Sequence, residues 1–346
     1  METLLRSNLS NKDINWINAA KALCIIFVYI RHCEGHYDDI YMDWPINGLF
    51  LTFYVNGFFF ISGYLLFWKQ LSTPRILETR KEYLTGGGKK LFDNIIFRII
   101  IPSIIFAAIE FFPSCIIQGR SISVGYALLK TVGGMTYWFT SALVVAQLLL
   151  LVLFCTRKKN IWFYAIIVAI IGLIGLVLAR IDVRVTDLWA WKRGLIAIIF
   201  LGIGGVYWKY ERQIDSLMHW SFIIPLLVVY VSIVIGLRNY ANPLISLCSI
   251  QPLGFVTSII GCLFLVWMCK KLPVMKSLTF IGQNSLGFYF MSGALPITLS
   301  KVAHALMPGT YFWMMIAIFI ISLGTAFVTV MGINRWLPWM WDLRRL

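Results

Sequence analysis

The stretch WINAAKALCIIFVYIRHCEGH, residues 16–36, decides the fold that the sequence predicts. It is an apolar run as long as a membrane-spanning helix, which takes about 20 residues. Lys21 and His32 are eleven residues apart, and at about 100° per residue this spacing returns to nearly the same helix face. The rise between them is about 16 Å, roughly half of the hydrocarbon thickness. The sequence therefore predicts one span that carries two costly polar groups on one face at different depths.

The composition extends this prediction to the whole chain. Of the 346 residues, 60% are apolar and 13% are charged, and the mean hydropathy is +0.80. A chain of this kind cannot cover itself with a polar surface in water. The net charge of +15 lies between the apolar runs, which argues against nucleic acid as a partner. We therefore expect an all-α polytopic membrane protein, surrounded by lipid, with one domain over residues 1–346 and no separate soluble domain.

Ten hydrophobic segments have a length near that of a bilayer span. Their approximate limits are 16–35, 45–68, 95–117, 133–154, 161–180, 190–208, 220–237, 244–269, 278–300 and 310–333. Basic residues are retained on the cytoplasmic side of membranes, so the charge of the connecting segments predicts the orientation. With both termini in the cytoplasm, the basic stretches 69–90, 157–159, 270–276 and 335–345 face inward, and Asp38, Asp39 and Asp43 face outward.

Two connecting segments leave alternatives open. Segment 180–193 holds Arg180, Arg184, Lys192 and Arg193, which would face outward; either they form a functional surface or a span is miscounted. The basic cytoplasmic loop 69–94 holds a GGG run at 86–88, followed by Lys89 and Lys90. Glycine backbone amides beside lysines can hold phosphate groups. The spacing matches no P-loop, and a flexible basic loop at the inner leaflet is the alternative interpretation.

Ionisable residues inside spans are candidates for function because each is costly in a bilayer. They are Lys21, Arg31, His32, Glu34, Arg98 and Glu110. Lys21 and Arg98 lie near span ends, where their side chains could also extend to the headgroups. A neutral imidazole at His32 could act as a general base toward a hydroxyl group, with a structural role as the alternative. The order HCEGH does not match a zinc motif and no third ligand is identifiable, so no metal site is expected.

Lys21 and His32 form the pattern of a basic residue, ten residues and a histidine, which resembles the first-span motif of the membrane acyltransferase 3 family. Further landmarks follow in the family's order. They are FFFISGYLLF at 58–67, Arg98 with Pro102, YWFTSAL at 137–143 and FIGQNSLGFYF at 280–290. WINAAKAL is similar to the branch that contains fucose 4-O-acetylase-like proteins. Together these segments cover most of the chain.

The resemblance implies an integral-membrane O-acyltransferase of a bacterial cytoplasmic membrane. Its expected reaction moves an acetyl group from cytoplasmic acetyl-CoA, as co-substrate, to a hydroxyl of a surface polysaccharide or its lipid-linked precursor. His32 would be the catalytic base and Lys21 its partner. Donor binding is assigned to Arg98, Lys89 and Lys90, and acceptor binding to Glu34, Trp138, Asn284, Ser285 and Tyr289.

The chain departs from the family pattern at several positions. Asn18 replaces a usual aspartate, Ile95 replaces the first arginine of an Arg-x-x-Arg pair, and Met291 and Ser292 stand where a histidine is frequent. No second catalytic histidine is therefore assigned, and the group that orients His32 is open, with Glu110 as one candidate. Trp138 could also be an interfacial aromatic residue, and Asn284 and Ser285 could be interhelical hydrogen-bonding groups.

Two other classes of function compete with the acyltransferase. In a glycan or lipid transporter or flippase, the intramembrane charges would line a substrate path without any bond being made. Such transporters usually show paired halves with broken helices in matching positions, and the sequence shows no such symmetry. In a sensor or scaffold, His32 would be dispensable.

Overall fold

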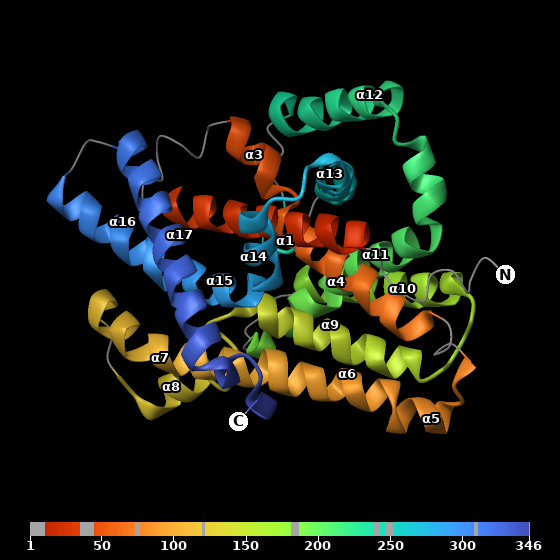
Figure 1. Ribbon diagram of the computed structural model, residues 1–346, viewed down its shortest axis with the longest axis horizontal. Helices are drawn as coiled ribbons and strands as arrows, with labels where there is room; N and C mark the ends of the chain where they lie inside the picture. Colours follow the sequence, from red (N-terminus) through yellow and green to blue (C-terminus); the bar gives the residue numbers. More distant parts are fainter. Residues whose placement is uncertain are drawn as a thin grey trace.

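The computed structural model describes residues 11–34, 45–72, 77–119, 122–180, 187–237, 242–245, 252–307 and 311–345. In these residues all regular structure is helical, which confirms the all-α fold class (Figure 1). The first part comprises α1 Asn11–Glu34, α3 Pro45–Leu51, α4 Tyr54–Leu71, α5 Arg80–Thr85, α6 Gly87–Ile95, the π-helical turn η3 Ile96–Ile100, α7 Ile101–Gln118, α8 Val124–Lys130, α9 Trp138–Phe154 and α10 Ile161–Arg180. The second comprises η4 Leu188–Ala190, α11 Trp191–Leu217, α12 Trp220–Val231, the π-helical turn η5 Ser232–Gly236, α13 Pro252–Lys271, α14 Lys276–Gln283, α15 Ser285–Ser292, α16 Ala294–Leu306, α17 Tyr311–Trp336, η7 Pro338–Met340 and η8 Leu343–Arg345.

The described helices include seven that are long and apolar enough to cross a membrane. They lie at Asn15–Cys33, Gly48–Leu71, Arg80–Pro113, Ile161–Arg180, Leu188–Leu217, Pro252–Lys271 and Phe312–Trp336. Two more of the ten expected segments, Trp138–Phe154 and Trp220–Gly236, are apolar helices of shorter length. The segment expected at 278–300 is divided among α14, α15 and α16, because the helix is interrupted at Asn284 and Gly293.

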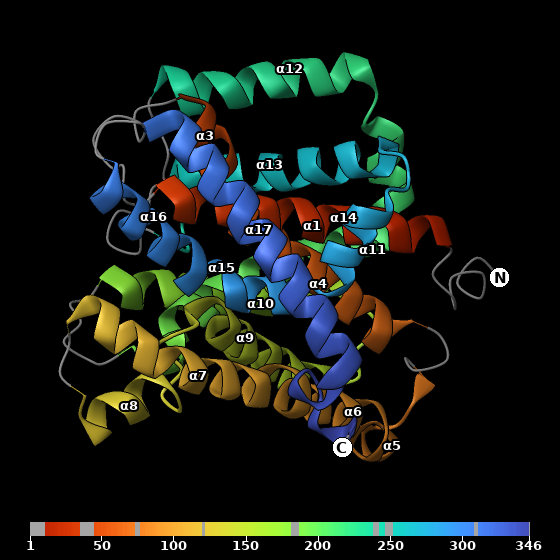
Figure 2. The ribbon, with the colours of Figure 1, turned by 60° about the vertical axis from the view of Figure 1, so that its left-hand side comes forward.

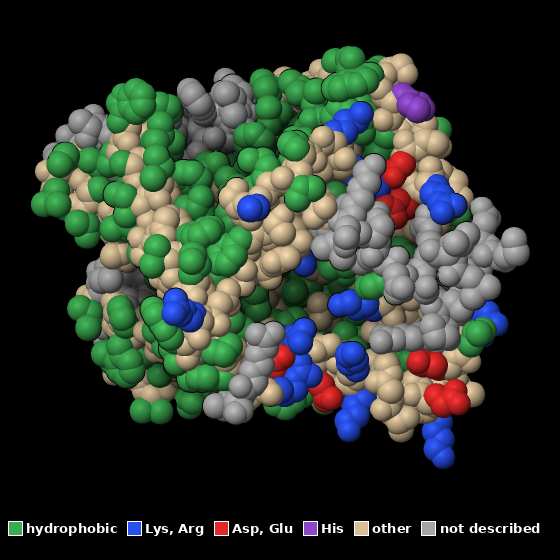
Figure 3. Space-filling view, in the orientation of Figure 1, with side chains coloured by type: hydrophobic (Ala, Val, Ile, Leu, Met, Phe, Trp, Pro, Cys, Tyr) green, Lys and Arg blue, Asp and Glu red, His purple; other side chains and the backbone are tan. Residues whose placement is uncertain are grey.

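Helix α1 lies in the middle of the bundle and packs against α4, α13, α14, α15, α16 and α17 (Figure 1). Its buried face includes the small side chains of Ala19, Ala20 and Ala22, which let the neighbouring helices approach closely. Figure 2 shows α5, α6 and the C-terminal turns at one end of the bundle and α8 and α16 at the other. Figure 3 shows hydrophobic side chains over much of one face, with Lys and Arg gathered mostly in its right-hand half. On this face the basic side chains therefore lie mostly toward one end of the bundle.

Residues 80–95 form two helices rather than a flexible loop. Gly86 lies between α5 and α6, and Gly87 and Gly88 are buried against Tyr83. A Cβ atom on Gly88 would lie 2.9 Å from Cε1 of Tyr83. The three glycines therefore allow a tight turn and close packing, and the flexible-loop interpretation is wrong for this stretch.

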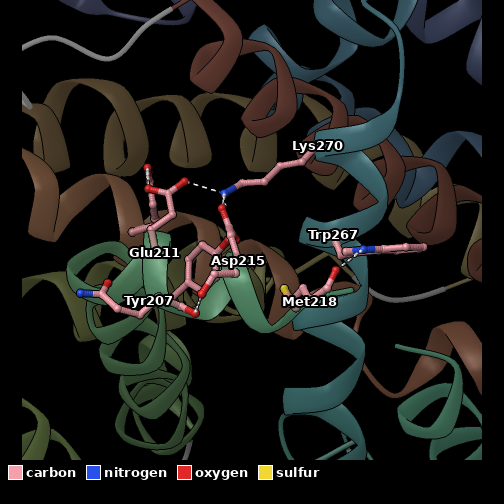
Figure 4. Close-up of polar contacts among 9 residues, drawn as sticks. Tyr207, Glu211, Asp215, Met218, Trp267 and Lys270 are labelled. Atoms are coloured by element: carbon pink, nitrogen blue, oxygen red, sulfur yellow. Dashed lines mark hydrogen bonds and ion pairs between the residues drawn. The ribbon is translucent and has the colours of Figure 1, made fainter. Parts of the chain in front are cut away.

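An ionic cluster joins α13 to α11 and α4 (Figure 4). The Lys270 ammonium group donates to Oε1 of Glu211 and Oδ2 of Asp215, both at 2.6 Å, and to the Tyr207 hydroxyl at 2.9 Å. Tyr207 donates to the other Asp215 oxygen at 2.6 Å, and Tyr64 donates to the other Glu211 oxygen at 2.8 Å. Charges inside a bundle persist only when they are paired and hydrogen-bonded in this way. Lys270, which the charge pattern placed in a cytoplasmic segment, thus points into the cluster.

Helices α4 and α11 share the most extensive contact between any two helices of the described chain. At this contact a Cβ atom on Gly63 would overlap the carbonyl oxygen of Leu201, and one on Gly204 would overlap that of Phe60. A helix backbone can approach this closely only where the residue that faces it is a glycine or another very small residue. The two glycines therefore set the distance between α4 and α11.

We predict that Gly63→Ala or Gly204→Ala destabilises the bundle, since the added methyl group must displace backbone atoms. The expected loss is about 1–3 kcal/mol or more, as for other overpacked cores. Thermal unfolding in detergent measures it. The control is Gly324→Ala on α17, where a Cβ atom would meet nothing within 4 Å and a slight gain is expected. Equal unfolding temperatures for Gly63→Ala and the native protein would contradict the close-packing role.

Candidate functional site

Lys21 and His32 of α1 line two different cavities. Lys21 lines a cavity of about 920 Å³, here named the basic cavity. His32 lines a second cavity of about 830 Å³, here named the histidine cavity. A hollow bordered by Lys and Arg side chains is visible near the centre of the face in Figure 3. The two residues, eleven positions apart on one helix, thus each line a separate cavity.

The basic cavity gathers cationic side chains from distant parts of the chain. They are Lys21 of α1, Lys69 of α4, Lys90 of α6, Arg98 of η3 and Arg344 of η8. Lys90 and Arg98 were predicted to bind the donor. Lys89, predicted with them, is exposed and does not line this cavity. The cavity therefore separates two neighbouring lysines that the sequence could not tell apart.

Arg98 lies in a π-helical turn, between α6 and α7. Such turns are rare and often occur at functional sites, because the wider turn re-aims the side chains that follow. Arg98 Nε donates to Oδ2 of Asp342 at 2.8 Å. The arginine thus meets the C-terminal part of the chain at the basic cavity.

The C-terminal turns complete the basic cavity with Asp342 and Arg344. Arg344 donates from Nε to Oδ1 of Asp342 and from Nη2 to Oδ2, both at 2.8 Å, and from Nη2 to Oδ1 of Asn94 at 3.0 Å. These hydrogen bonds from Arg344, together with that from Arg98, hold the pKa of the buried Asp342 well below its usual range. Sequence reasoning missed both residues, because nothing in a short tail indicates that it folds back onto residues some 250 positions earlier.

His32 is oriented by a backbone group. Its Nδ1 lies 2.5 Å from the carbonyl oxygen of Ser292, at the end of α15. Because a carbonyl oxygen can only accept, Nδ1 carries the hydrogen and the neutral ring presents the lone pair of Nε2. The expectation that a carboxylate could orient His32 is thus replaced by a backbone carbonyl.

Pro296 explains why this carbonyl is available. In a continuous helix the Ser292 carbonyl would accept from the N–H group of the residue four positions later. That residue is Pro296, which has no N–H group. The helix is also interrupted at Gly293, between α15 and α16. A proline four residues after Ser292 is the one sequence signal that could have indicated a free acceptor here.

Several other polar and aromatic side chains line the histidine cavity. Arg31 and Lys301 add positive charge, and Tyr137 and Trp138 add aromatic surface. Glu110, the candidate orienting carboxylate, lines the same cavity as Tyr137. An imidazole, a carboxylate and two cations thus line one cavity.

The basic segment 180–193 reaches this region through Arg193. Its guanidinium lies 5.0 Å from the centre of the Trp138 ring, and its Nη1 is 3.2 Å from Oδ2 of Asp187. Arg193 Nε also donates to the Leu244 carbonyl at 3.1 Å. Lys192 is buried and Arg180 is exposed, while Arg184 lies outside the described residues. Arg193 therefore supports Trp138, which lines the histidine cavity.

The remaining predicted site residues are divided between cavity and packing positions. Tyr289 lines both cavities and Ser285 lines the basic one. Asn284 accepts from Asn334 of α17 at 2.9 Å and lines neither cavity, which matches the interhelical alternative. Glu34 ends α1, but its side chain lies outside the described part of the chain. Within the residues that the structure describes, no group of three His, Cys, Asp or Glu side chains could hold a metal ion.

Comparison with known proteins identifies the family. A family model described as an acyltransferase domain matches residues 14–331, which is most of the chain and includes every landmark from Lys21 to Tyr289. No curated protein and no solved structure matches the chain. The chain therefore belongs to the acyltransferase 3 family, and this membership together with its long apolar helices makes it an integral-membrane acyltransferase.

Proposed function

We propose that the protein transfers an acetyl group from acetyl-CoA to a hydroxyl of a cell-surface polysaccharide or its lipid-linked precursor. The observation that carries this proposal is the pairing of a basic cavity with a histidine cavity along one helix, α1. The first has the charge that a phosphorylated donor needs, and the second has a base for a hydroxyl acceptor. Assignment to the fucose 4-O-acetylase-like branch remains part of this proposal.

The basic cavity suits the donor because coenzyme A carries several phosphate groups. Arginine and lysine side chains bind phosphate by charge-assisted hydrogen bonds. Five such side chains line this cavity, against the single carboxylate of Asp342. Asp342 holds Arg98 and Arg344 in fixed positions through the hydrogen bonds described above. The phosphates would then meet guanidinium groups that are already oriented.

The histidine cavity supplies the acid–base chemistry. The lone pair of His32 Nε2 takes the proton of the acceptor hydroxyl as the hydroxyl oxygen attacks the thioester carbonyl carbon. The new C–O bond forms, the C–S bond breaks, and the thiolate of coenzyme A leaves and takes up a proton. The hydrogen bond from Nδ1 to the Ser292 carbonyl stabilises the imidazolium that forms in between. Lys21 contributes from the donor side, where it lines the basic cavity.

The acceptor region suits a sugar. Aromatic rings such as Trp138 and Tyr137 offer flat apolar surface. Arg31 and Lys301 favour an anionic glycan, and Arg193 adds a cation behind Trp138. Both termini and the basic cavity would then lie on the cytoplasmic side, with ten spans in a bacterial cytoplasmic membrane. The positive charge at the Lys21 end supports this orientation.

We predict that His32→Ala lowers acetyl transfer by roughly 10²- to 10⁴-fold, the usual contribution of a general base. Membranes containing the protein would be incubated with radiolabelled acetyl-CoA and a cell-envelope glycan extract of the host. The matched control is His219→Ala, since His219 is exposed and lines neither cavity. Transfer that survives His32→Ala at equal expression would remove His32 as the base. No transfer by the native protein, with glycan export altered instead, would favour the transporter.

We also predict that Lys90→Ala raises the KM for acetyl-CoA while Lys89→Ala does not. The two lysines are adjacent, but only Lys90 lines the basic cavity. Loss of a charge-assisted contact to phosphate should raise KM roughly tenfold, with kcat nearly unchanged. Initial rates against donor concentration, in membranes with equal protein content, provide the measurement. Equal KM values for the two variants would place the donor outside this cavity.

A further inference from the structure

The basic cavity and the histidine cavity meet at three aromatic side chains. Phe58, Phe139 and Tyr289 line both cavities, and no other described residue does so. They come from α4, α9 and α15, so three separate helices close this boundary. Lys21 and Arg98 lie on one side of these rings, and His32 and Glu110 lie on the other.

Phe139 contacts both of the other rings. The ring centres of Phe58 and Phe139 are 5.4 Å apart, and those of Phe139 and Tyr289 are 5.1 Å apart. These are the separations of aromatic rings in contact. Phe58 and Phe139 are only 8% and 7% exposed. The boundary between the two cavities is therefore filled by side chains.

Phe139 and Tyr289 also contact aromatic rings outside this group of three. Phe139 packs against Phe59, with ring centres 4.9 Å apart, and against the neighbouring Trp138. The Tyr289 ring contacts Tyr137, with ring centres 5.8 Å apart. Phe139 thus connects the rings of Phe58 and Tyr289.

This arrangement restricts how the acyl group reaches the base. A donor held by its phosphates among Lys21, Lys90 and Arg98 would extend its pantetheine arm, which ends in the thioester, from the basic cavity toward His32. His32 does not line that cavity. The acyl carbonyl must therefore come to the boundary, where the rings leave little room. Each methylene group added to the acyl chain would have to displace a packed aromatic side chain, which is costly in a close-packed interior.

We propose that Phe58, Phe139 and Tyr289 form an aromatic partition that presents the acyl group to His32 and limits it to a short one, acetyl in preference to butyryl. This inference rests on the proposed function and names the residues that select the acyl group. The rings exclude by size, since they carry no charge that could distinguish one acyl group from another. The acceptor stays in the histidine cavity and does not cross the partition.

The test compares labelled acetyl-CoA, propionyl-CoA and butyryl-CoA as donors for membranes with the native protein, Phe58→Leu or Phe139→Leu. Leucine keeps the site apolar while removing part of the ring. The matched control is Phe59→Leu, because Phe59 contacts Phe139 but lines neither cavity. The measured quantity is the ratio of butyryl to acetyl transfer within each preparation. This ratio does not depend on the amount of protein, so a variant made in lower yield can still be compared.

The expected result is a ratio raised roughly tenfold or more in Phe58→Leu and Phe139→Leu, the discrimination typical of one or two methylenes, and unchanged in Phe59→Leu. Acetyl transfer by the native protein with the same ratio in all variants would overturn the partition and leave the proposed function standing. A rise of equal size in Phe59→Leu would also overturn it, since general loosening would then be the cause. No transfer from any donor by the native protein would overturn the proposed function and this inference with it.

Discussion

The hydrogen bond between His32 and the Ser292 carbonyl is the interaction on which the site depends. It decides which ring nitrogen carries the proton, and it fixes the orientation of a ring that lines the histidine cavity. The acceptor is free because Pro296 cannot satisfy it and because the helix is interrupted at Gly293. The break between α15 and α16 thus leaves a carbonyl group that orients His32 of α1. Inside an apolar bundle such pairing is close to obligatory, because an unmet carbonyl or imidazole is costly there.

The same constraint organises the other charged groups of the described chain. Lys270 is surrounded by Glu211, Asp215 and Tyr207, which ties α13 to α11. Asp342 is held by Arg98 and Arg344, which ties the C-terminal turns to η3. Each cluster joins helices that are distant in sequence. Arg98 and Arg344 also line the basic cavity, whereas Lys270 lines neither cavity, so the second cluster borders a candidate binding site and the first is structural.

Much of the helical framework could be predicted from the sequence, because apolar runs of bilayer length have few alternatives to a helix. The observed helices differ from the prediction in three respects. The segment at 278–300 is broken at Asn284 and Gly293, and two other segments are shorter than a full span. The glycines at 86–88 suggested flexibility, but two of them pack against Tyr83. A glycine run has the same appearance in a sequence whether it bends freely or lies against a ring.

The sequence by itself determined that the chain is a helical membrane protein, that Lys21 and His32 share a helix face, and that its landmarks follow the order of one acyltransferase family. These properties depend on composition and on the short-range period of the helix. Only the tertiary structure decided that the two residues serve separate cavities, that Ser292 orients His32, that Asp342 and Arg344 return to Arg98, and that three rings divide the cavities. Those contacts join residues up to 260 positions apart, and helix packing, which no local pattern encodes, brings them together.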